Sequence, residues 1–525
     1  MAVSFSPPGE RGSLRARARA AESGRYQGKG TFMSVMFIQQ SDGTYEQVPV
    51  TPENTRRYID SIPIYREDDD PTFWSQDKIH DLQDTMFKRQ MELVWEGHDY
   101  YRSLFKENGI EPGDITGIDD LEKMPLTYKK DYMADPEAFK LKPAQPTIYD
   151  WIFEVTYTTG STTGVPTPFW NTIHDSYGIW QMIFRGIKMG GFPPYSTVIN
   201  LFPVGPVPHI GYFRARDICT WGIGSMSMSG CTGMPYPEFM VHRSMDYAID
   251  CIENGKAEVW LGIASFMRRL IMKAEAEGRD FSETKHIQAL GEACPRAMRE
   301  DMKRRLQSMG ADDPFISNSY GFTEMQGAMA ECTEFSGCHN PSPNLYFFEV
   351  VDEKTGKRLP DGERGLFCIT HLNRRGTVLL RYVIGDLGAL THETCPHCGR
   401  NGERSVVAVG STYATRTAEL VKVKGTLINP EILRDELAKT PGVQEYQIVF
   451  TKKDLEDPYS LDDLIVKIAP EPGFDTAEME DRIQTALVTA VEMRAKIQFV
   501  PMEEIYDPTV ALKAYRVLDL RPKLD

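Results

Sequence analysis

Apolar and polar positions alternate along most of the chain in a pattern typical of mixed helices and strands. Residues 197–202 and 257–261 are short apolar runs of strand length, whereas 266–277 and 300–308 place apolar residues at helical spacing. Residues 76–108 show the same helical spacing and end near a glycine. Strands that alternate with helices predict an α/β fold in which helices cover the sheets.

The final part of the chain follows a different pattern. Apolar positions at helical spacing mark residues 430–439 and 476–493, and alternating apolar positions mark strands at 446–450, 464–468 and 497–500. Two strands between two helices, with a further strand behind them, predict a small α+β domain. The sequence therefore indicates two domains of different architecture.

We divide the chain into a large N-terminal domain of helix-covered mixed sheets at residues 33–415, a hinge at 416–419 and a small α+β domain at 420–525. Residues 1–32 contain five arginines among Ala, Ser and Gly and no apolar core of the kind that a secretory signal has. We expect them to form a disordered extension; a transit peptide and a translation start at Met33 are the alternatives.

Composition excludes several classes of function. The 59 Lys and Arg residues against 75 Asp and Glu give a net charge of −16, which argues against a nucleic-acid-binding protein because such proteins need a basic face. No apolar run approaches the roughly 18–20 residues that cross a bilayer. Nine cysteines in 525 residues are too few for a disulfide framework, so we expect a reduced, cytoplasmic protein.

The segment at residues 158–167 is a candidate phosphate-binding loop. It reads Thr-Thr-Gly-Ser-Thr-Thr-Gly-Val-Pro-Thr and follows a strand-like run. Glycine lets the backbone approach a ligand, and successive N–H and hydroxyl groups can hold phosphate oxygens. The segment lacks the Gly-Lys-Ser/Thr ending of a Walker loop, and a flexible turn is the alternative. The candidate ligands are Thr159, Ser161, Thr162, Thr163 and Gly164.

Two further segments carry candidate nucleotide chemistry. In residues 319–324, the ring of Tyr320 can stack on a purine beside Gly321, Thr323 can bond a phosphate, and Glu324 can hold Mg²⁺, which prefers carboxylate and phosphate oxygens. The strand-like run 380–386 ends at Asp386, whose carboxylate suits the two hydroxyls of a ribose. A turn at the end of a strand explains either segment equally well.

In this order and rough spacing, the three segments resemble those of the adenylate-forming enzymes, which include acyl-CoA synthetases, peptide-synthetase adenylation domains and luciferases. The sequence most resembles the phenylacetate–CoA ligase branch, over about residues 75–520. Supporting features are Val-Pro-Thr at 165–167, Gly-Glu-Ala-Cys-Pro at 291–295 and Glu-Cys at 331–332. Residues 415–425 resemble the hinge segment of that family, and 512–519 resemble the tail that carries its catalytic lysine.

The resemblance implies an ATP-dependent acid–CoA ligase that activates an aryl or arylacetic carboxylate as an acyl-adenylate. Pyrophosphate leaves first, and the thiol of coenzyme A then displaces AMP while a mobile C-terminal domain changes position. Lys513, Thr323 and Glu324 would be catalytic, with ATP, Mg²⁺ and coenzyme A as cofactors. The implied nucleotide contacts, beside the loop, are Gly291, Glu292, Tyr320, Gly321, Asp386, Arg416 and Lys424.

Several alternatives stay open at this stage. Ala418 stands where many relatives carry the hinge aspartate, and Leu512 replaces the glycine that usually precedes the lysine, so Lys513 is also explained as a surface residue. The acceptor can be a carrier-protein thiol or an amine, and a non-catalytic nucleotide-binding relative is a third hypothesis. The expected partner is a small carboxylic acid, which Arg214 and Arg216 could meet at a second carboxylate, and a homodimer is compatible with the sequence.

The cysteines suggest a metal site apart from the nucleotide chemistry. Cys395 and Cys398 have the Cys-x₂-Cys spacing that places two thiolates on one tetrahedral ion, and Cys332 and Cys338 lie upstream. We predict one structural Zn²⁺ held by these four cysteines, with His339 as the substitute for Cys332. Four free cysteines in a reducing compartment are the alternative.

Overall fold

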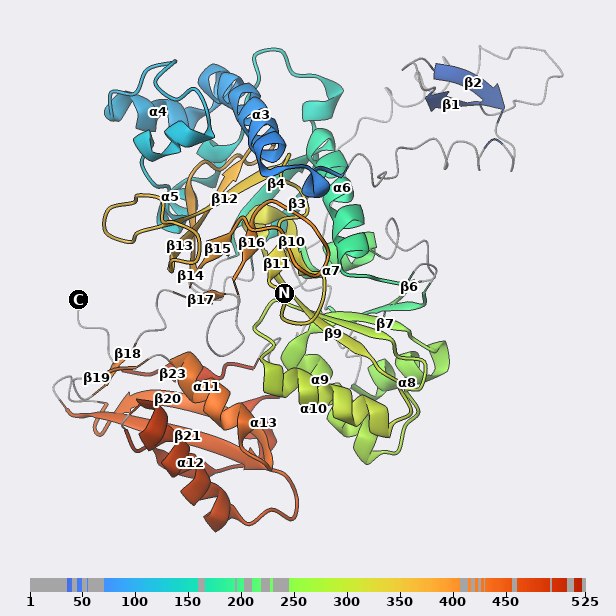
Figure 1. Ribbon diagram of the computed structural model, residues 1–525, viewed down its shortest axis with the longest axis vertical. Helices are drawn as coiled ribbons and strands as arrows, with labels where there is room; N and C mark the ends of the chain where they lie inside the picture. Colours follow the sequence, from blue (N-terminus) through green and yellow to red (C-terminus); the bar gives the residue numbers. More distant parts are fainter. Residues whose placement is uncertain are drawn as a thin grey trace, which may run out of the picture. The chain divides into compact units, whose positions relative to one another are not determined.

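A computed structural model of the chain describes residues 35–39, 45–49, 54, 70–158, 166–193, 196–202, 210–218, 227–229, 245–406, 414–416, 421–423, 426–428, 430–455, 460–491, 493–507 and 514–521. Contacts between residues divide the chain into two units, residues 1–64 and 65–525. In the first unit, β1 (Val35–Gln39) pairs antiparallel with β2 (Tyr45–Pro49) (Figure 1). The predicted extension at residues 1–32 lies outside the described residues.

The second unit contains a large mixed sheet with the strand order β15-β16-β11-β10-β9-β8-β7-β5-β6. Its parallel strands are β5 (Val198–Asn200), β6 (Ser227–Ser229), β7 (Val259–Ile263), β8 (His286–Leu290) and β9 (Phe315–Phe322). Its antiparallel strands are β10 (Gly327–Glu331), β11 (Cys338–His339), β15 (Leu390–Thr391) and β16 (Arg404–Ser405). Every residue of β7 is buried, as expected for a parallel strand covered on both faces.

Amphipathic helices pack against this sheet, which confirms the predicted α/β fold. Helix α9 contacts β7 and its neighbour α10, α10 contacts β9, and α6 contacts β10. The helices are α6 (Ile173–Met189), α7 (Ile210–Asp217), α8 (Met245–Gly255), α9 (Ala264–Ala276) and α10 (Arg296–Ser308). Among the described residues, no helix is both long and apolar enough to span a membrane.

A smaller antiparallel sheet has the order β12-β13-β14-β17, and a separate hairpin joins β3 to β4. The sheet strands are β12 (Tyr346–Val351), β13 (Gly365–His371), β14 (Tyr382–Gly388) and β17 (Ala414–Arg416). The hairpin strands are β3 (Ile152–Tyr157) and β4 (Pro168–Thr172). Together they position two of the predicted nucleotide segments, because β14 contains Asp386 and the hairpin leads into the predicted phosphate loop.

The helical stretch predicted at residues 76–108 forms two helices, α3 (Gln76–Gly97) and α4 (Asp99–Glu107). His98 separates them because its ring nitrogen accepts a hydrogen bond from the Tyr101 backbone N–H at 3.3 Å and so caps α4. The other ring nitrogen lies 3.1 Å from the Phe139 carbonyl. Burial lowers the pKa of His98 to about 4, so the ring is neutral at physiological pH.

The C-terminal part has its own sheet, in the order β22-β21-β20-β23, and its own apolar core. The strands are β20 (Val443–Lys452), β21 (Asp462–Pro470), β22 (Lys496–Phe499) and β23 (Val517–Asp519). The helices are α11 (Pro430–Lys439), α12 (Thr476–Val491) and the short α13 (Met502–Ile505), and β18 (Val421–Val423) pairs with β19 (Thr426–Ile428). The predicted helices and strands are all present, whereas the domain boundaries at 415 and 420 stay predictions.

Candidate functional site

Two predicted nucleotide segments meet at the ends of β9 and β14. The hydroxyl of Tyr320, on β9, donates a hydrogen bond of 2.7 Å to the Asp386 carboxylate on β14. Arg416 lies opposite Asp386 in the register of β17 against β14. Three of the candidate nucleotide residues, separated by up to 96 positions in the sequence (416 − 320 = 96), are therefore neighbours. Open α/β sheets bind ligands at such strand ends, where the topology of the sheet changes.

Glu324 occupies a buried turn immediately after β9. Its side-chain carboxylate accepts a hydrogen bond of 3.1 Å from the Tyr382 hydroxyl, and its backbone carbonyl lies 2.9 Å from a ring nitrogen of His371. Burial raises the pKa of Glu324, and the negative charge of Asp386 acts in the same direction. A divalent cation would relieve both effects, because it supplies the positive charge that a buried carboxylate lacks.

The turn around Thr323 and Glu324 is fixed by Gln326, a residue that the sequence analysis did not identify. Gln326 has a left-handed backbone with φ of 57° and donates its backbone N–H to the Thr323 carbonyl at 3.0 Å. Its buried side-chain oxygen accepts hydrogen bonds from Asn171 at 2.7 Å and from Thr156 at 3.1 Å. These bonds hold a strained non-glycine backbone in place, which is typical of functional turns.

Gly321 is explained by the packing of two strands. A Cβ atom at this position would lie 2.7 Å from the Gly327 carbonyl oxygen and 2.8 Å from the Ala328 side chain. Both neighbours are on β10, so a side chain at Gly321 would push β10 away from β9. The glycine therefore serves the sheet, and its predicted nucleotide contact stays a prediction.

The base of the predicted phosphate loop is closed by a pair of threonines. Thr158 donates its backbone N–H to the Thr167 carbonyl at 3.0 Å, and Thr167 donates its own N–H to the Thr158 hydroxyl, also at 3.0 Å. The loop residues Thr159, Ser161, Thr162, Thr163 and Gly164, together with Lys424 and Lys513, lie outside the described residues. Their predicted roles stay predictions.

The carboxylate of Glu292 faces groups of the protein, and its predicted nucleotide contact stays a prediction. One of its carboxylate oxygens accepts a hydrogen bond from the Ser265 backbone N–H in the first turn of α9. The other lies 3.9 Å from a guanidinium nitrogen of Arg516, in the C-terminal segment. The preceding Gly291 has φ of 81°, a left-handed conformation that gives the loop its direction.

The loop at residues 291–295 is held by a buried arginine that the sequence analysis did not identify. Arg299, on α10, donates from Nε to the Cys294 carbonyl at 2.9 Å and from Nη1 to the Glu331 carboxylate at 2.8 Å. Glu331 also accepts the Asn318 backbone N–H at 2.7 Å. This pair connects α10, the loop after β8 and the strand that carries Tyr320.

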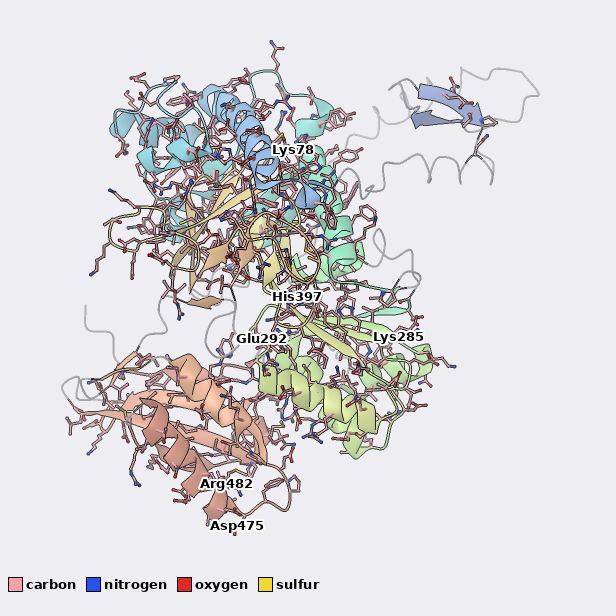
Figure 2. The ribbon with its side chains drawn as sticks, viewed as in Figure 1. Lys78, Lys285, Glu292, His397, Asp475 and Arg482 are labelled. Atoms are coloured by element: carbon pink, nitrogen blue, oxygen red, sulfur yellow. The ribbon has the colours of Figure 1, made fainter. Side chains whose placement is uncertain are left out.

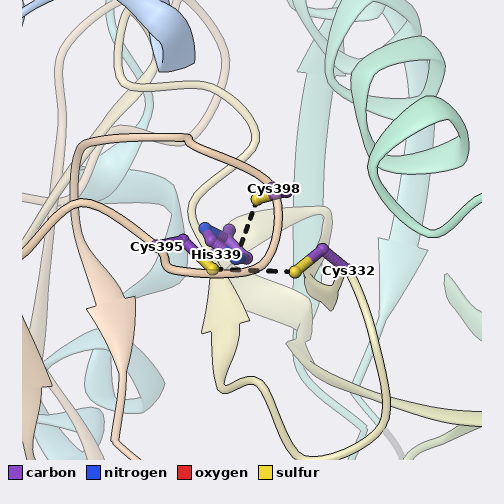
Figure 3. Close-up of side chains that lie close together, drawn as sticks. All are labelled: Cys332, His339, Cys395 and Cys398. Carbon is purple, nitrogen blue, oxygen red and sulfur yellow. Dashed lines mark hydrogen bonds between the residues drawn. The ribbon is translucent and has the colours of Figure 1, made fainter.

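Four potential metal ligands converge beside the β10–β11 hairpin (Figure 3). Cys332 and His339 come from β10–β11, and Cys395 and Cys398 come from the loop between β15 and β16; all four ligand atoms lie within 4.8 Å of one another. The sulfurs of Cys332 and Cys395 are 3.8 Å apart, and the Cys398 sulfur is 3.7 Å from His339 Nε2. Ligand atoms of a tetrahedral zinc with Zn–S bonds of about 2.3 Å are about 3.8 Å apart.

The predicted ligand set needs one correction, because the structure places His339 in the position expected for Cys338. Neighbouring residues of a strand point to opposite faces, so only one of the two can join the cluster. Cys338 is fully buried on the other face, with its sulfur 3.8 Å from the Asn318 carbonyl, and burial raises the pKa of its thiol. His339 therefore replaces Cys338, whereas the prediction had it replacing Cys332.

The two arginines considered for a second substrate carboxylate face carboxylates of the protein. Arg214 is buried and pairs with Glu154 and Asp217. Arg216 pairs with Asp217 at 2.8 Å. Their charges are therefore balanced within the protein itself.

Comparison with known proteins agrees with this arrangement. Residues 214–373 match the model of the AMP-binding enzyme family. The phenylacetate–coenzyme A ligase of Thermus thermophilus is 28% identical over 408 residues, which cover 76% of this chain and 83% of the relative. The corresponding ligase of Aromatoleum evansii is 25% identical over 464 residues, which cover 86% of this chain and 96% of the relative. These matches make the chain similar to the adenylate-forming enzymes, and among them to the phenylacetate–CoA ligases.

The fold agrees with that of a solved acid–CoA ligase. It aligns with 2-hydroxyisobutyryl-CoA ligase in the postadenylation state with a TM-score of 0.70 at 21% identity, covering 85% of this chain and 90% of that one. The thioesterification state of the same ligase aligns over similar lengths with a TM-score of 0.56. The structure is thus geometrically closer to the first of these two arrangements.

Replacing Glu324 with Gln is expected to stabilise the protein in the absence of nucleotide and magnesium. Burial raises the pKa of Glu324, so the charged carboxylate is less favourable in the folded state than in the unfolded chain, where water surrounds it. Gln keeps the shape and removes the charge. The destabilising effect is present above the folded-state pKa and disappears as the pH falls below the unfolded value of about 4.3.

Urea denaturation of metal-free protein at pH 7 and pH 4 measures this effect. At pH 7 the variant should be more stable than the wild type by more than the roughly 0.5 kcal/mol that exposed substitutions produce, and the difference should vanish at pH 4. Glu478→Gln is the matched control, since that side chain is 63% exposed on α12. A variant that is less stable at pH 7 would show that the Glu324 carboxylate is favourable in the unliganded protein.

Proposed function

We propose that the protein is an ATP-dependent, AMP-forming acid–CoA ligase that activates an aromatic monocarboxylic acid through an acyl-adenylate. The observation that carries the proposal is the convergence of Tyr320, Asp386 and the buried Glu324 at the ends of β9 and β14. These are the residues that the superfamily resemblance assigns to the nucleotide and its metal ion. The named relatives in the phenylacetate–CoA ligase branch support the acid and thiol substrates.

The chemical problem of the first step is to bring two anions together. The substrate carboxylate attacks the α-phosphate of ATP and pyrophosphate leaves. Mg²⁺ held at Glu324 would supply positive charge against the phosphate oxygens. The loop at residues 158–167 supplies backbone N–H and hydroxyl donors, and Lys513 supplies a cation near the reacting groups.

The second step breaks the bond between the acyl group and AMP that the first step formed, and it needs a different arrangement of charges around that bond. The thiol of coenzyme A attacks the acyl carbon and AMP leaves, so the cation that favoured the first step is no longer required. We infer that the domain at residues 420–525 turns about the hinge at 416–419 and carries Lys513 away. Thr323 and Glu324 lie at the end of β9, outside this moving domain.

The proposed substrate class is narrower than the sequence alone allowed. Arg214 and Arg216 face Glu154 and Asp217, so their charges are already compensated and a second substrate carboxylate would meet acidic neighbours. This favours a monocarboxylic acid over a dicarboxylic one. The aromatic character of the acid rests on the phenylacetate-specific names of the relatives.

A panel of carboxylic acids tests the proposal directly. Pyrophosphate release is measured with aromatic monocarboxylates, aliphatic acids and dicarboxylates, each with and without coenzyme A. The proposal expects multiple turnovers only with an aromatic monocarboxylate and only when coenzyme A is present. Turnover that needs a carrier-protein thiol or an amine would change the acceptor, and no turnover with any acid would leave a nucleotide-binding protein without ligase activity.

Lys513→Ala is expected to separate the two half-reactions. The lysine charge is needed only while the carboxylate attacks the phosphate, so adenylate formation should fall on the order of 10²–10³-fold. Thioester formation from preformed acyl-adenylate should stay within about twofold of the wild type, because that step does not use the charge. Isotope exchange between pyrophosphate and ATP measures the first rate. An equal loss in both half-reactions would contradict the assigned role.

We also propose that Cys332, His339, Cys395 and Cys398 hold one structural Zn²⁺. Three thiolates and one imidazole at these separations are a familiar closed donor set for zinc, and such a site has no open position for substrate. The ion would connect the hairpin after Glu324 to the loop after β15. Its effect would be on stability, since the free energy of metal binding is also folding free energy.

Elemental analysis of purified protein is expected to find one zinc per chain. Cys398→Ser should lose zinc and lower the midpoint of urea unfolding, whereas Cys338→Ala should keep the zinc, because Cys338 points away from the cluster. The two variants form a matched pair, since both remove one thiol from the same region. Zinc well below one equivalent in wild-type protein never exposed to chelator would mean that the cluster is a set of free side chains.

A further inference from the structure

Arg516 is buried where the C-terminal domain meets the rest of the second unit. It lies just before β23 and three residues after Lys513, and its side chain is about as buried as the apolar core. Nε and Nη2 of its guanidinium donate to the two oxygens of Glu445 at 2.9 and 3.0 Å. Burial alone would raise the pKa of Glu445, but the Arg516 charge holds it below its usual value. Both residues belong to the C-terminal domain, so this bidentate pair moves with that domain.

The remaining nitrogen of Arg516 points towards the N-terminal domain. Nη1 is buried, has no hydrogen-bond partner among the described residues, and lies 3.9 Å from a carboxylate oxygen of Glu292. Figure 2 shows Glu292 where the loop after β8 approaches the C-terminal domain. The other oxygen of Glu292 accepts the Ser265 N–H at the start of α9, which fixes the direction of the carboxylate.

A second contact reaches the same helix start. The backbone N–H of Ala514 donates to the Ser265 hydroxyl at 3.4 Å. Ala514 directly follows Lys513 in the sequence, so this contact and the Glu292 contact bracket the segment 514–516. The first turn of α9 is therefore the surface against which this segment rests.

Ion pairs surround this contact and join the same two domains. Arg305 on α10 pairs with Glu471 of the C-terminal domain, and Arg269 on α9 donates to Glu503 at 2.7 Å. Arg268 donates to the backbone carbonyl of Gln444. Most of these groups are partly exposed, whereas Arg516 is buried, so among the described residues Arg516 and Glu292 form the least solvated of these charged contacts between the domains.

We propose that Glu292 and Arg516 form a docking pair that positions residues 514–516, and with them Lys513, for the adenylation step. This inference rests on the proposed function. Glu292 and Arg516 are positioning residues that act through the lysine. The sequence resemblance had placed Glu292 among the nucleotide contacts, whereas the structure directs both of its carboxylate oxygens to other groups.

The geometry makes this pair specific to one arrangement of the domains. When the C-terminal domain turns, Arg516 and Glu445 move together, while Glu292 and Ser265 stay with α9. The contact between Glu292 and Arg516 is then lost, so it can favour only the arrangement in which it forms. Weakening it should slow adenylation and leave thioester formation unaffected.

Two variants test the proposal by half-reaction kinetics. Glu292→Gln removes the charge and keeps the shape, and Arg516→Lys keeps the charge and loses the bidentate fork. For each, the rate of pyrophosphate–ATP exchange should fall on the order of 10–100-fold with the KM for ATP within about twofold of wild type. Thioester formation from preformed acyl-adenylate should change by less than about twofold. Glu478→Gln, an exposed Glu-to-Gln change on α12, should match the wild type in every assay.

Two kinetic results would overturn the proposal. A higher KM for ATP with an unchanged exchange rate at saturation would make Glu292 a nucleotide contact, as the sequence resemblance implied. An equal loss in both half-reactions would show that the pair serves general stability. A melting temperature within a few degrees of wild type excludes misfolding as the cause of a selective adenylation defect.

Hydrogen exchange on the unliganded protein provides a readout that does not depend on activity. Glu292→Gln should increase backbone exchange at residues 263–266 and 514–519, whereas Glu478→Gln should not. Unchanged exchange at both segments would show that the pair does not hold the domains together. If the wild type turns over no acid at all, the ligase proposal fails, and the exchange measurement still decides the docking pair.

Discussion

The buried pair between Arg299 and Glu331 is the interaction on which the rest of the site depends. Both side chains are almost fully removed from solvent, and removing one partner of such a pair typically costs about 3–5 kcal/mol. Arg299 holds the Cys294 carbonyl, and Glu331 holds the backbone of Asn318. The loop that carries Glu292 and the strand that carries Tyr320 are thus fixed relative to each other by one polar contact.

The Arg299–Glu331 pair fixes its neighbours permanently, whereas the charged contacts between the two domains suit an interface that can open. In the proposed reaction the C-terminal domain moves twice per turnover, and a large apolar interface would oppose this motion because every opening would expose that surface to water. Partly exposed ion pairs such as Arg269 with Glu503 contribute only about 0–1 kcal/mol each. Several weak contacts around the buried pair of Arg516 and Glu292 would define one position of the C-terminal domain and still allow it to leave that position.

Much of the fold was predictable because it depends on local patterns. Helix α11 begins at Pro430 and ends at Lys439 as predicted, since proline at the first position and apolar residues on one face mark its limits. The prediction at 76–108 missed the break at His98, because the ring caps α4 and contacts carbonyls that arrive from distant parts of the chain. Such a contact leaves no trace in the periodicity of the stretch itself.

The types of residue in the site were predictable from the sequence, but the directions in which their side chains point were not. The sequence indicated that Cys332, Cys395 and Cys398 belong together, yet the choice between Cys338 and His339 depends on which face of a two-residue strand points to the cluster. The sequence did not identify Arg299, and it identified Arg516 only as part of the matched tail, because their carboxylate partners are 32 and 71 positions away. Glu292 belongs to a recognised motif, but only the three-dimensional structure shows that its carboxylate faces α9 and Arg516.

The proposed function assigns a fixed role to one part of the protein and a moving role to another. Burial raises the pKa of Glu324 and the charge of Asp386 acts in the same direction, so a cation bound here would relieve both effects. In the proposed reaction, magnesium would arrive with the nucleotide, whereas Lys513 would arrive with the C-terminal domain. Carboxylates held next to sheet strands would keep the metal position constant through both proposed steps, and a cation on a mobile domain could be withdrawn after the first. In the proposed mechanism, the separation of fixed acidic groups from a removable basic one would allow a single site to favour first the attack on phosphate and then the attack on carbon.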